Sequence, residues 1–98
     1  MSKFGQLIDV NHPLLLVFYN ETDTLSSAMH PILKDVANEM GDSAKVIKIN
    51  SEKNEKLAQA LRVKVLPTLM IYKEGEMLWR QSGEQDANTL IGLIQVHV

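Results

Sequence analysis

The order of hydrophobic and polar positions predicts a chain in which helices alternate with strands. The run "LLLVFY" at residues 14–19 is continuously apolar, as expected of a central strand that is covered on both faces. The run "KVIKIN" at residues 45–50 predicts another strand. The segment "TLMIYKEGEMLWRQ" at residues 68–81 predicts a hairpin, because two β-rich runs flank Glu74 and Gly75, and glycine tolerates positive φ in a tight turn.

Apolar residues recur at three- and four-residue steps over residues 24–40, which predicts a long amphipathic helix. Its apolar positions are Leu25, Ala28, Met29, Ile32, Leu33, Val36, Ala37 and Met40. Gly41 is a natural C-terminal stop, and Pro31 should kink the helix because its ring clashes with the preceding turn. Shorter helices are predicted at residues 3–10, 55–62 and 86–98, the last with Asp86 as N-cap. The order α-β-α-β-α-β-β-α predicts one sheet between helices.

Length, composition and charge indicate an ordinary globular protein. The 98 residues suffice for one core, so we expect a single domain over residues 1–98. Ten Lys and Arg residues against twelve Asp and Glu give a net charge of -2, so no basic field exists to bind nucleic acid or an anionic membrane. The apolar runs are far shorter than the ~20 residues that span a bilayer. We therefore expect neither nucleic acid nor a membrane as a partner.

The absence of cysteine excludes several classes of chemistry for these residues. Disulfides, thiolate nucleophiles, cysteine-ligated zinc and iron–sulfur clusters all need a sulfur that the sequence does not supply. The three histidines form no zinc motif, so we expect neither a metal nor a cofactor. The start "MSKFGQLIDVNHP" is polar and interrupted, unlike a signal peptide, and a cytoplasmic location is expected.

Several sequence segments, taken in order, resemble the thioredoxin family over essentially the whole chain. They are "LLLVFY" before a polar turn and a long helix, "HPIL" at residues 30–33, "VIKIN", "VLPTLMIYKEGE" at residues 65–76, and Gly83. The resemblance implies an α/β thioredoxin-like fold with a mixed four-stranded sheet flanked by helices on both faces. The N-terminal edge strand of the family has no counterpart here. Residues 45–50 would then form a sheet edge that can recruit another strand. Lysines on an edge strand, such as Lys45 and Lys48, disfavour pairing with a further strand.

The departures from the family pattern remove its chemistry. The motif Trp-Cys-Gly-Pro-Cys falls on residues 22–26, where Asp23 and Ser26 replace the two cysteines. Thiol–disulfide exchange needs both sulfurs, so neither replacement can perform it. The family's buried aspartate falls on Val17, and its partner lysine is matched by Lys48. We therefore expect no disulfide oxidoreductase activity.

Asp23 and Ser26 occupy the first turn of the predicted long helix, and capping of that helix is the expected role of both. One alternative is that Asp23 binds an anion or a metal at the surface. Another is a serine–histidine pair, because Ser26 and His30 are four residues apart on one helix face. A hydrolase would also need an orienting acid and an oxyanion hole, and no sequence feature supplies them.

The resemblance also implies a cis bond between Leu66 and Pro67, beside the turn that holds the family motif. In the family the backbone before this proline binds extended substrate peptide; the alternative is that Pro67 only shapes the entry into a strand. A surviving peptide groove would comprise Tyr19, Thr22, Leu25, Leu66, Pro67 and Gly83.

The sequence thus predicts a redox-inactive thioredoxin-like binding or scaffold module, which is a monomer or a weak homodimer. Two alternatives remain open. One is an interaction protein that dimerises through the edge at residues 45–50. The other is an uncharacterised family member nominally assigned to thiol–disulfide redox homeostasis.

Overall fold

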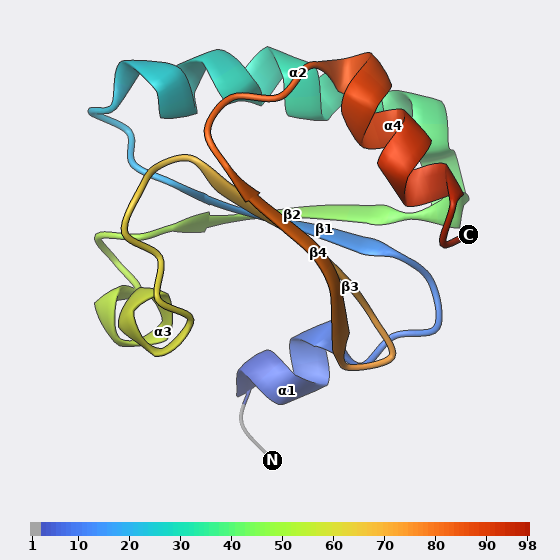
Figure 1. Cartoon of the computed structure of the whole chain (residues 1–98), viewed down its shortest axis with the longest axis horizontal. Helices are drawn as coiled ribbons and strands as arrows, with labels where there is room; N and C mark the ends of the chain where they lie inside the picture. Colours follow the sequence, from blue (N-terminus) through green and yellow to red (C-terminus); the bar gives the residue numbers. More distant parts are fainter. Residues whose placement is uncertain (1–2) are drawn as a thin grey trace.

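The computed structural model describes residues 3–98 and places one mixed sheet between two helical layers (Figure 1). The elements are α1 (Lys3–Ile8), β1 (Leu14–Tyr19), α2 (Thr24–Met40), the 3-10 turn η1 (Gly41–Ser43), β2 (Lys45–Asn50), α3 (Glu55–Ala60), β3 (Thr68–Lys73), β4 (Glu76–Ser82) and α4 (Ala87–Gln95). The strand order is β2-β1-β3-β4, with β2 parallel to β1 and the other pairs antiparallel. The predicted α/β architecture and its four-stranded sheet are confirmed.

The sheet divides the apolar core into two clusters. Along β1, Leu15 and Val17 belong to the cluster under α2 and α4, whereas Leu14, Leu16 and Phe18 belong to the cluster over α1 and α3. Figure 1 shows these helix pairs on opposite faces of the sheet. Because successive side chains of a strand point to opposite faces, a strand covered on both sides must be apolar at every position. This is the physical reason for the uninterrupted run "LLLVFY".

Helix α2 spans the predicted residues and ends at the predicted stop. Its buried apolar side chains are Met29, Leu33, Val36 and Met40, and full burial of such a side chain contributes roughly 1.5–3 kcal/mol. Gly41 is the C-cap with φ 55°, and its N–H donates to the carbonyl of Ala37. Of the predicted apolar positions, Ala28 and Ala37 are exposed, and Leu25 is 47% exposed. The contact stripe of α2 is therefore narrower than the sequence pattern indicates.

The first helix is shorter than predicted, because tertiary hydrogen bonds compete with its last turn. It ends at Ile8 rather than at residue 10. The tip of the β3–β4 hairpin uses the carbonyls there: Gly75 N–H donates to Ile8 O at 3.0 Å, and Glu74 N–H donates to Val10 O at 2.7 Å. Glu74 and Gly75 have φ values of 53° and 81°, as the predicted tight turn requires.

The two other short helices also end earlier than predicted. Helix α3 ends at Ala60, and Arg62 then takes a positive φ of 56°. The guanidinium of Arg80, on β4, donates to the carbonyls of Leu61 and Arg62 and satisfies the open end of the helix. Helix α4 ends at Gln95 instead of continuing to the last residue.

Candidate functional site

The turn at residues 20–23, which leads into α2, is closed by its own polar groups. Asp23 N–H donates to Asn20 O at 3.1 Å, and Asn20 Oδ1 accepts from the N–H of Thr22 at 2.9 Å and from its hydroxyl at 2.8 Å. Asp23 is the N-cap, and its Oδ2 accepts from Ser26 N–H at 2.9 Å. No group of three metal-ligating side chains occurs among residues 3–98. The carboxylate of Asp23 is therefore engaged in capping.

The expectation that Ser26 also caps the helix is wrong. Its side chain is fully buried, and within the described residues its Oγ has no hydrogen-bond partner. The side chain is buried in the first turn of α2, and its hydroxyl accepts from none of the N–H groups at the helix end. Its backbone N–H receives the cap from Asp23, whereas its side chain provides none.

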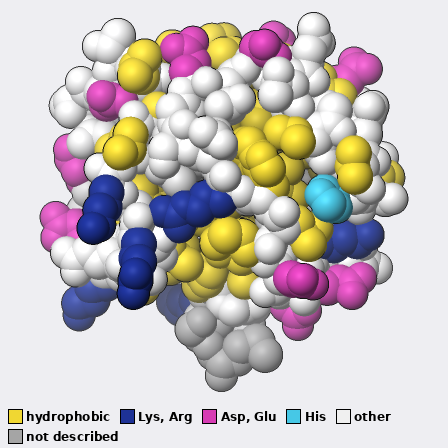
Figure 2. All heavy atoms as spheres, in the orientation of Figure 1, with side chains coloured by type: hydrophobic (Ala, Val, Ile, Leu, Met, Phe, Trp, Pro, Cys, Tyr) yellow, Lys and Arg dark blue, Asp and Glu magenta, His cyan; other side chains and the backbone are white. Residues whose placement is uncertain are grey.

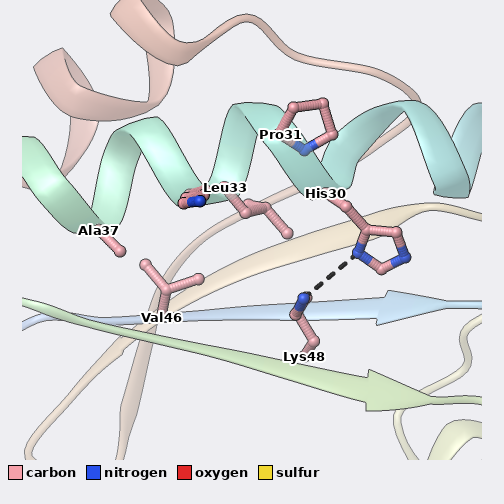
Figure 3. A pocket seen from close by; sticks show the side chains of 7 residues that line it. His30, Pro31, Leu33, Ala37, Val46 and Lys48 are labelled. Carbon is pink, nitrogen blue, oxygen red and sulfur yellow. Dashed lines mark hydrogen bonds between the residues drawn. The ribbon is translucent and has the colours of Figure 1, made fainter.

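His30 and Lys48 face each other between α2 and β2, as Figure 3 shows. Lys48 Nζ lies 3.3 Å from His30 Nδ1, and the Tyr19 ring contacts the His30 ring edge to face, with 5.2 Å between their centroids. His30 is thus paired with a lysine and a tyrosine, and not with Ser26, so the serine–histidine alternative is not formed. Val17 is completely buried in the cluster under α2 and α4.

The residues proposed for a peptide groove gather at one end of the sheet. Strands β1 and β3 are antiparallel with Phe18 opposite Thr68, so the end of β1 at Tyr19 lies beside the residues that precede β3. The Leu66–Pro67 peptide bond is cis. Gly83 N–H donates to Pro67 O at 2.8 Å, which joins the end of β4 to the same region. The fold therefore brings these distant segments together.

This end of the sheet carries exposed apolar side chains and an unpaired backbone unit. Leu25 is 47% exposed and Val65 is 55% exposed, while Thr22 is exposed and Leu66 is half-buried. Within the described residues, the backbone N–H and C=O of Leu66 make no hydrogen bond. The two clefts described next lie beside β2.

Two clefts flank β2, and sequence reasoning did not identify them. The upper cleft lies between α2 and β2 and has a volume of about 450 Å³; Figure 3 shows His30, Pro31, Leu33, Ala37, Val46 and Lys48 around it. The lower cleft, on the α1 and α3 side, has a volume of about 540 Å³, and its lining includes Lys3, Phe4, Leu7, Lys53 and Leu57. Tyr19, which was expected in the peptide groove, also lines the lower cleft. The clefts share a lining of lysines, at residues 3, 34, 48 and 53, and these lysines were the only sequence feature that could have indicated the clefts.

Two titratable groups outside this region have shifted pKa values. Burial raises the pKa of the Tyr72 phenol, and the nearby charge of Arg80 opposes this effect. Asp86 is the N-cap of α4, as predicted, and its Oδ1 accepts from Thr89 N–H at 2.7 Å. This hydrogen bond lowers the pKa of the Asp86 carboxyl. Both groups serve the fold and lie outside the candidate site.

Comparison with known proteins identifies the relatives of this chain. It is 35% identical over 95 residues to the chloroplastic thioredoxin Y of Oryza sativa subsp. japonica, covering 96% of this chain but 56% of the rice protein. It is 34% identical over 86 residues to the thioredoxin-like protein slr0233 of Synechocystis, covering 88% of this chain and 82% of that protein. A mutant thioredoxin from Halobacterium salinarum superposes with a TM-score of 0.88 at 27% identity, over 99% of this chain and 84% of that one.

The family assignment rests on fold and sequence together. The sequence profile of the thioredoxin family matches residues 1–96, almost the full length of the chain. No helix within residues 3–98 is long and apolar enough to cross a membrane. The motif positions nevertheless hold Asp23 and Ser26, and the sequence contains no cysteine. The chain belongs to the thioredoxin family and lacks the two thiols on which disulfide reduction by that family depends.

Proposed function

We propose that this chain is a redox-inactive thioredoxin-like binding module that recognises an extended peptide at the end of the sheet where Leu66, Pro67 and Gly83 meet. The module comprises residues 1–98 and acts in the cytoplasm as a monomer or a weak homodimer. Its ligand is a protein or peptide segment, and it performs no disulfide exchange, because Asp23 and Ser26 form no reversible sulfur–sulfur bond.

The unpaired backbone of Leu66 is the observation that supports this proposal. An extended peptide binds through main-chain hydrogen bonds, and Leu66 offers one donor and one acceptor on a half-buried segment. Leu25 and Val65 add exposed apolar surface nearby in the fold, and exposed apolar patches commonly mark interaction sites. Binding here needs none of the lost thiol chemistry.

A pull-down with matched variants tests the binding surface. Proteins retained by the wild type should be lost with Leu25→Glu and with Pro67→Ala. They should remain with Met77→Glu, which places the same charge on β4 at a comparably exposed apolar residue. Equal retention by wild type, Leu25→Glu and Pro67→Ala would contradict the proposal.

An insulin-disulfide reduction assay with a reductase system tests the redox part separately. We expect no turnover above background, because the chain has no cysteine to carry the exchange. Turnover by the purified chain would overturn this part of the proposal.

We also propose a cytoplasmic location for the protein. The rice relative is named as a chloroplast protein, so the location needs a direct test. Fractionation of cells that produce the protein at its native level should recover it with cytoplasmic markers; recovery with an organelle or an envelope fraction would contradict the assignment.

A further inference from the structure

Strand β2 is an open edge of the sheet within the described residues. It pairs with β1 on one side, and no strand of residues 3–98 pairs with it on the other. Lys45 N–H donates to Pro13 O, and Ser51 N–H donates to Tyr19 O, so the odd-numbered residues of β2 bond toward β1. Because the backbone groups of a strand alternate in direction, the N–H and C=O groups of Val46 and Lys48 point to the open side.

The open edge lies between the two clefts. Val46 and Lys48 line the upper cleft, whereas Lys48 and Ile49 line the lower cleft. An added strand would project successive side chains to opposite faces, and each face of this edge has a partly apolar cleft to receive them. Leu33 contributes apolar surface above, and Leu57 contributes it below. The geometry of the edge therefore suits an extended segment with apolar side chains.

The charged side chains that line the two clefts all have one sign. The charged side chains that line the upper cleft are Lys34 and Lys48, and those that line the lower cleft are Lys3, Lys48 and Lys53. Lys45 adds another charge at the exposed start of the strand. No Asp or Glu lines either cleft, although the whole chain has a net charge of -2. By contrast, Figure 2 shows acidic and basic side chains together on the face toward β4 and α4.

We propose that the open edge of β2 binds an extended acidic peptide segment as a fifth strand of the sheet. Main-chain hydrogen bonds to Val46 and Lys48 hold the segment, and its carboxylates pair with the surrounding lysines. A second copy of this chain is the disfavoured occupant, because two β2 edges would bring Lys45 and Lys48 of both copies together, and like charges across strands are destabilising. This site is distinct from the one proposed at Leu66.

A short synthetic peptide that alternates glutamate and valine is the probe, and a peptide with lysine in place of each glutamate is its control. Fluorescence anisotropy gives the affinity, and amide chemical shifts with hydrogen exchange give the location. We expect the glutamate peptide to bind at least tenfold more tightly than the lysine peptide, with affinity falling as salt rises. The amides of Val46 and Lys48 should shift and exchange more slowly in the complex.

Two substitutions separate the backbone from the charge. Val46→Pro removes an N–H that faces the open side and changes no charge, so it should block strand addition without removing a hydrogen bond to β1. Lys48→Glu keeps the N–H and reverses the charge. Each should weaken binding of the glutamate peptide at least tenfold. Lys64→Glu makes the same charge change on an exposed loop outside both clefts and should alter affinity less than twofold.

Three results would overturn the proposal. The first is equal affinity for the two peptides, or affinity for the glutamate peptide that survives Lys48→Glu. The second is amide shifts centred on Leu66 and Gly83 with none at Val46 and Lys48, which would place the probe at the other site. The third is concentration-dependent dimerisation in sedimentation that Val46→Pro abolishes, which would make a second copy the occupant of the edge.

Discussion

Replacing Ser26 with alanine should stabilise the fold, because it removes a buried hydroxyl that has no partner. Ser26 is completely buried in the first turn of α2, and its Oγ makes no hydrogen bond within the described residues. A buried polar group left unsatisfied costs about 1–3 kcal/mol. Alanine also exceeds serine in helix propensity by roughly 0.5 kcal/mol. The cap is unaffected, because Asp23 accepts from the backbone N–H of Ser26.

The opposing effect is small. Removal of one oxygen atom leaves a void of roughly 10 Å³. At about 24 cal/mol per Å³ of cavity, this void lowers the free energy of unfolding by only a few tenths of a kcal/mol. We therefore expect Ser26→Ala to raise the free energy of unfolding by about 1–2 kcal/mol. In a domain of this size that gain corresponds to an increase in Tm of roughly 4–8 °C per kcal/mol.

Urea unfolding followed by circular dichroism measures the change, with an unchanged m-value as evidence that the folded and unfolded states are comparable. Ser27→Ala is the comparison variant, because Ser27 is the next residue of α2, is exposed and gains the same helix propensity. Its Oγ donates to Glu21 O at 3.4 Å, so the two variants compare a buried hydroxyl that has no partner with an exposed hydroxyl that has one. If Ser26→Ala stabilises no more than Ser27→Ala, or destabilises the protein, the hydroxyl carries no desolvation cost and the reasoning is refuted.

Four further predictions follow from the caps, the shifted pKa values and the motif positions. Asp23→Ala should lower the free energy of unfolding by about 1 kcal/mol in urea titrations, because Ser26 N–H loses its acceptor; an unchanged midpoint would contradict this. Burial raises the Tyr72 pKa, so the stability tied to its neutral phenol is complete below about pH 10 and is lost as pH rises through the raised value. Tyr72→Phe should therefore flatten the alkaline decline in Tm, and a curve parallel to wild type would count against this account. The Asp86 pKa is lowered, so its stabilisation is complete above about pH 4 and is lost as pH falls through the lowered value. Asp86→Ala should lower Tm at neutral pH and weaken its decline in acid, whereas Asp86→Ala with the acid profile of the wild type would refute the capping role. Asp23→Cys/Ser26→Cys should create weak insulin-reducing activity, limited by Val17 in place of the family's aspartate; activity absent from the fully folded double variant would show that more than the thiols is missing.

Signals confined to one or two helical turns were read correctly from the sequence. The predicted caps at Asp23, Gly41 and Asp86 are all present, because each depends on backbone groups only a few residues away. The strand at Leu14–Tyr19 was equally clear, since burial on both faces leaves no position for a polar residue. The loss of thiol chemistry also needed no structure, because it follows from residue identity alone.

Long-range contacts occur at the ends of two helices, α1 and α3, that were predicted too long. The end of α1 at Ile8 is set by the hairpin tip sixty-odd residues later in the chain, as the Gly75 hydrogen bond shows. At the end of α3 the Arg80 guanidinium donates to the carbonyls of Leu61 and Arg62, beside the local hydrogen bond from Val63 N–H to Ala58 O. Neither long-range contact has a local signature, so helix propensity alone extended both helices too far.

Sequence alone determined the fold class, the caps at Asp23, Gly41 and Asp86, and the absence of the family's dithiol. Tertiary structure decided which side of α2 holds Ser26 and that Lys48 meets His30. It also decided that lysines from three other segments line the clefts beside the open strand. The physical reason is the range of the interactions. Caps and strand burial act over a few residues, whereas the partner of a side chain and the charge of a surface depend on segments that only the folded chain brings together.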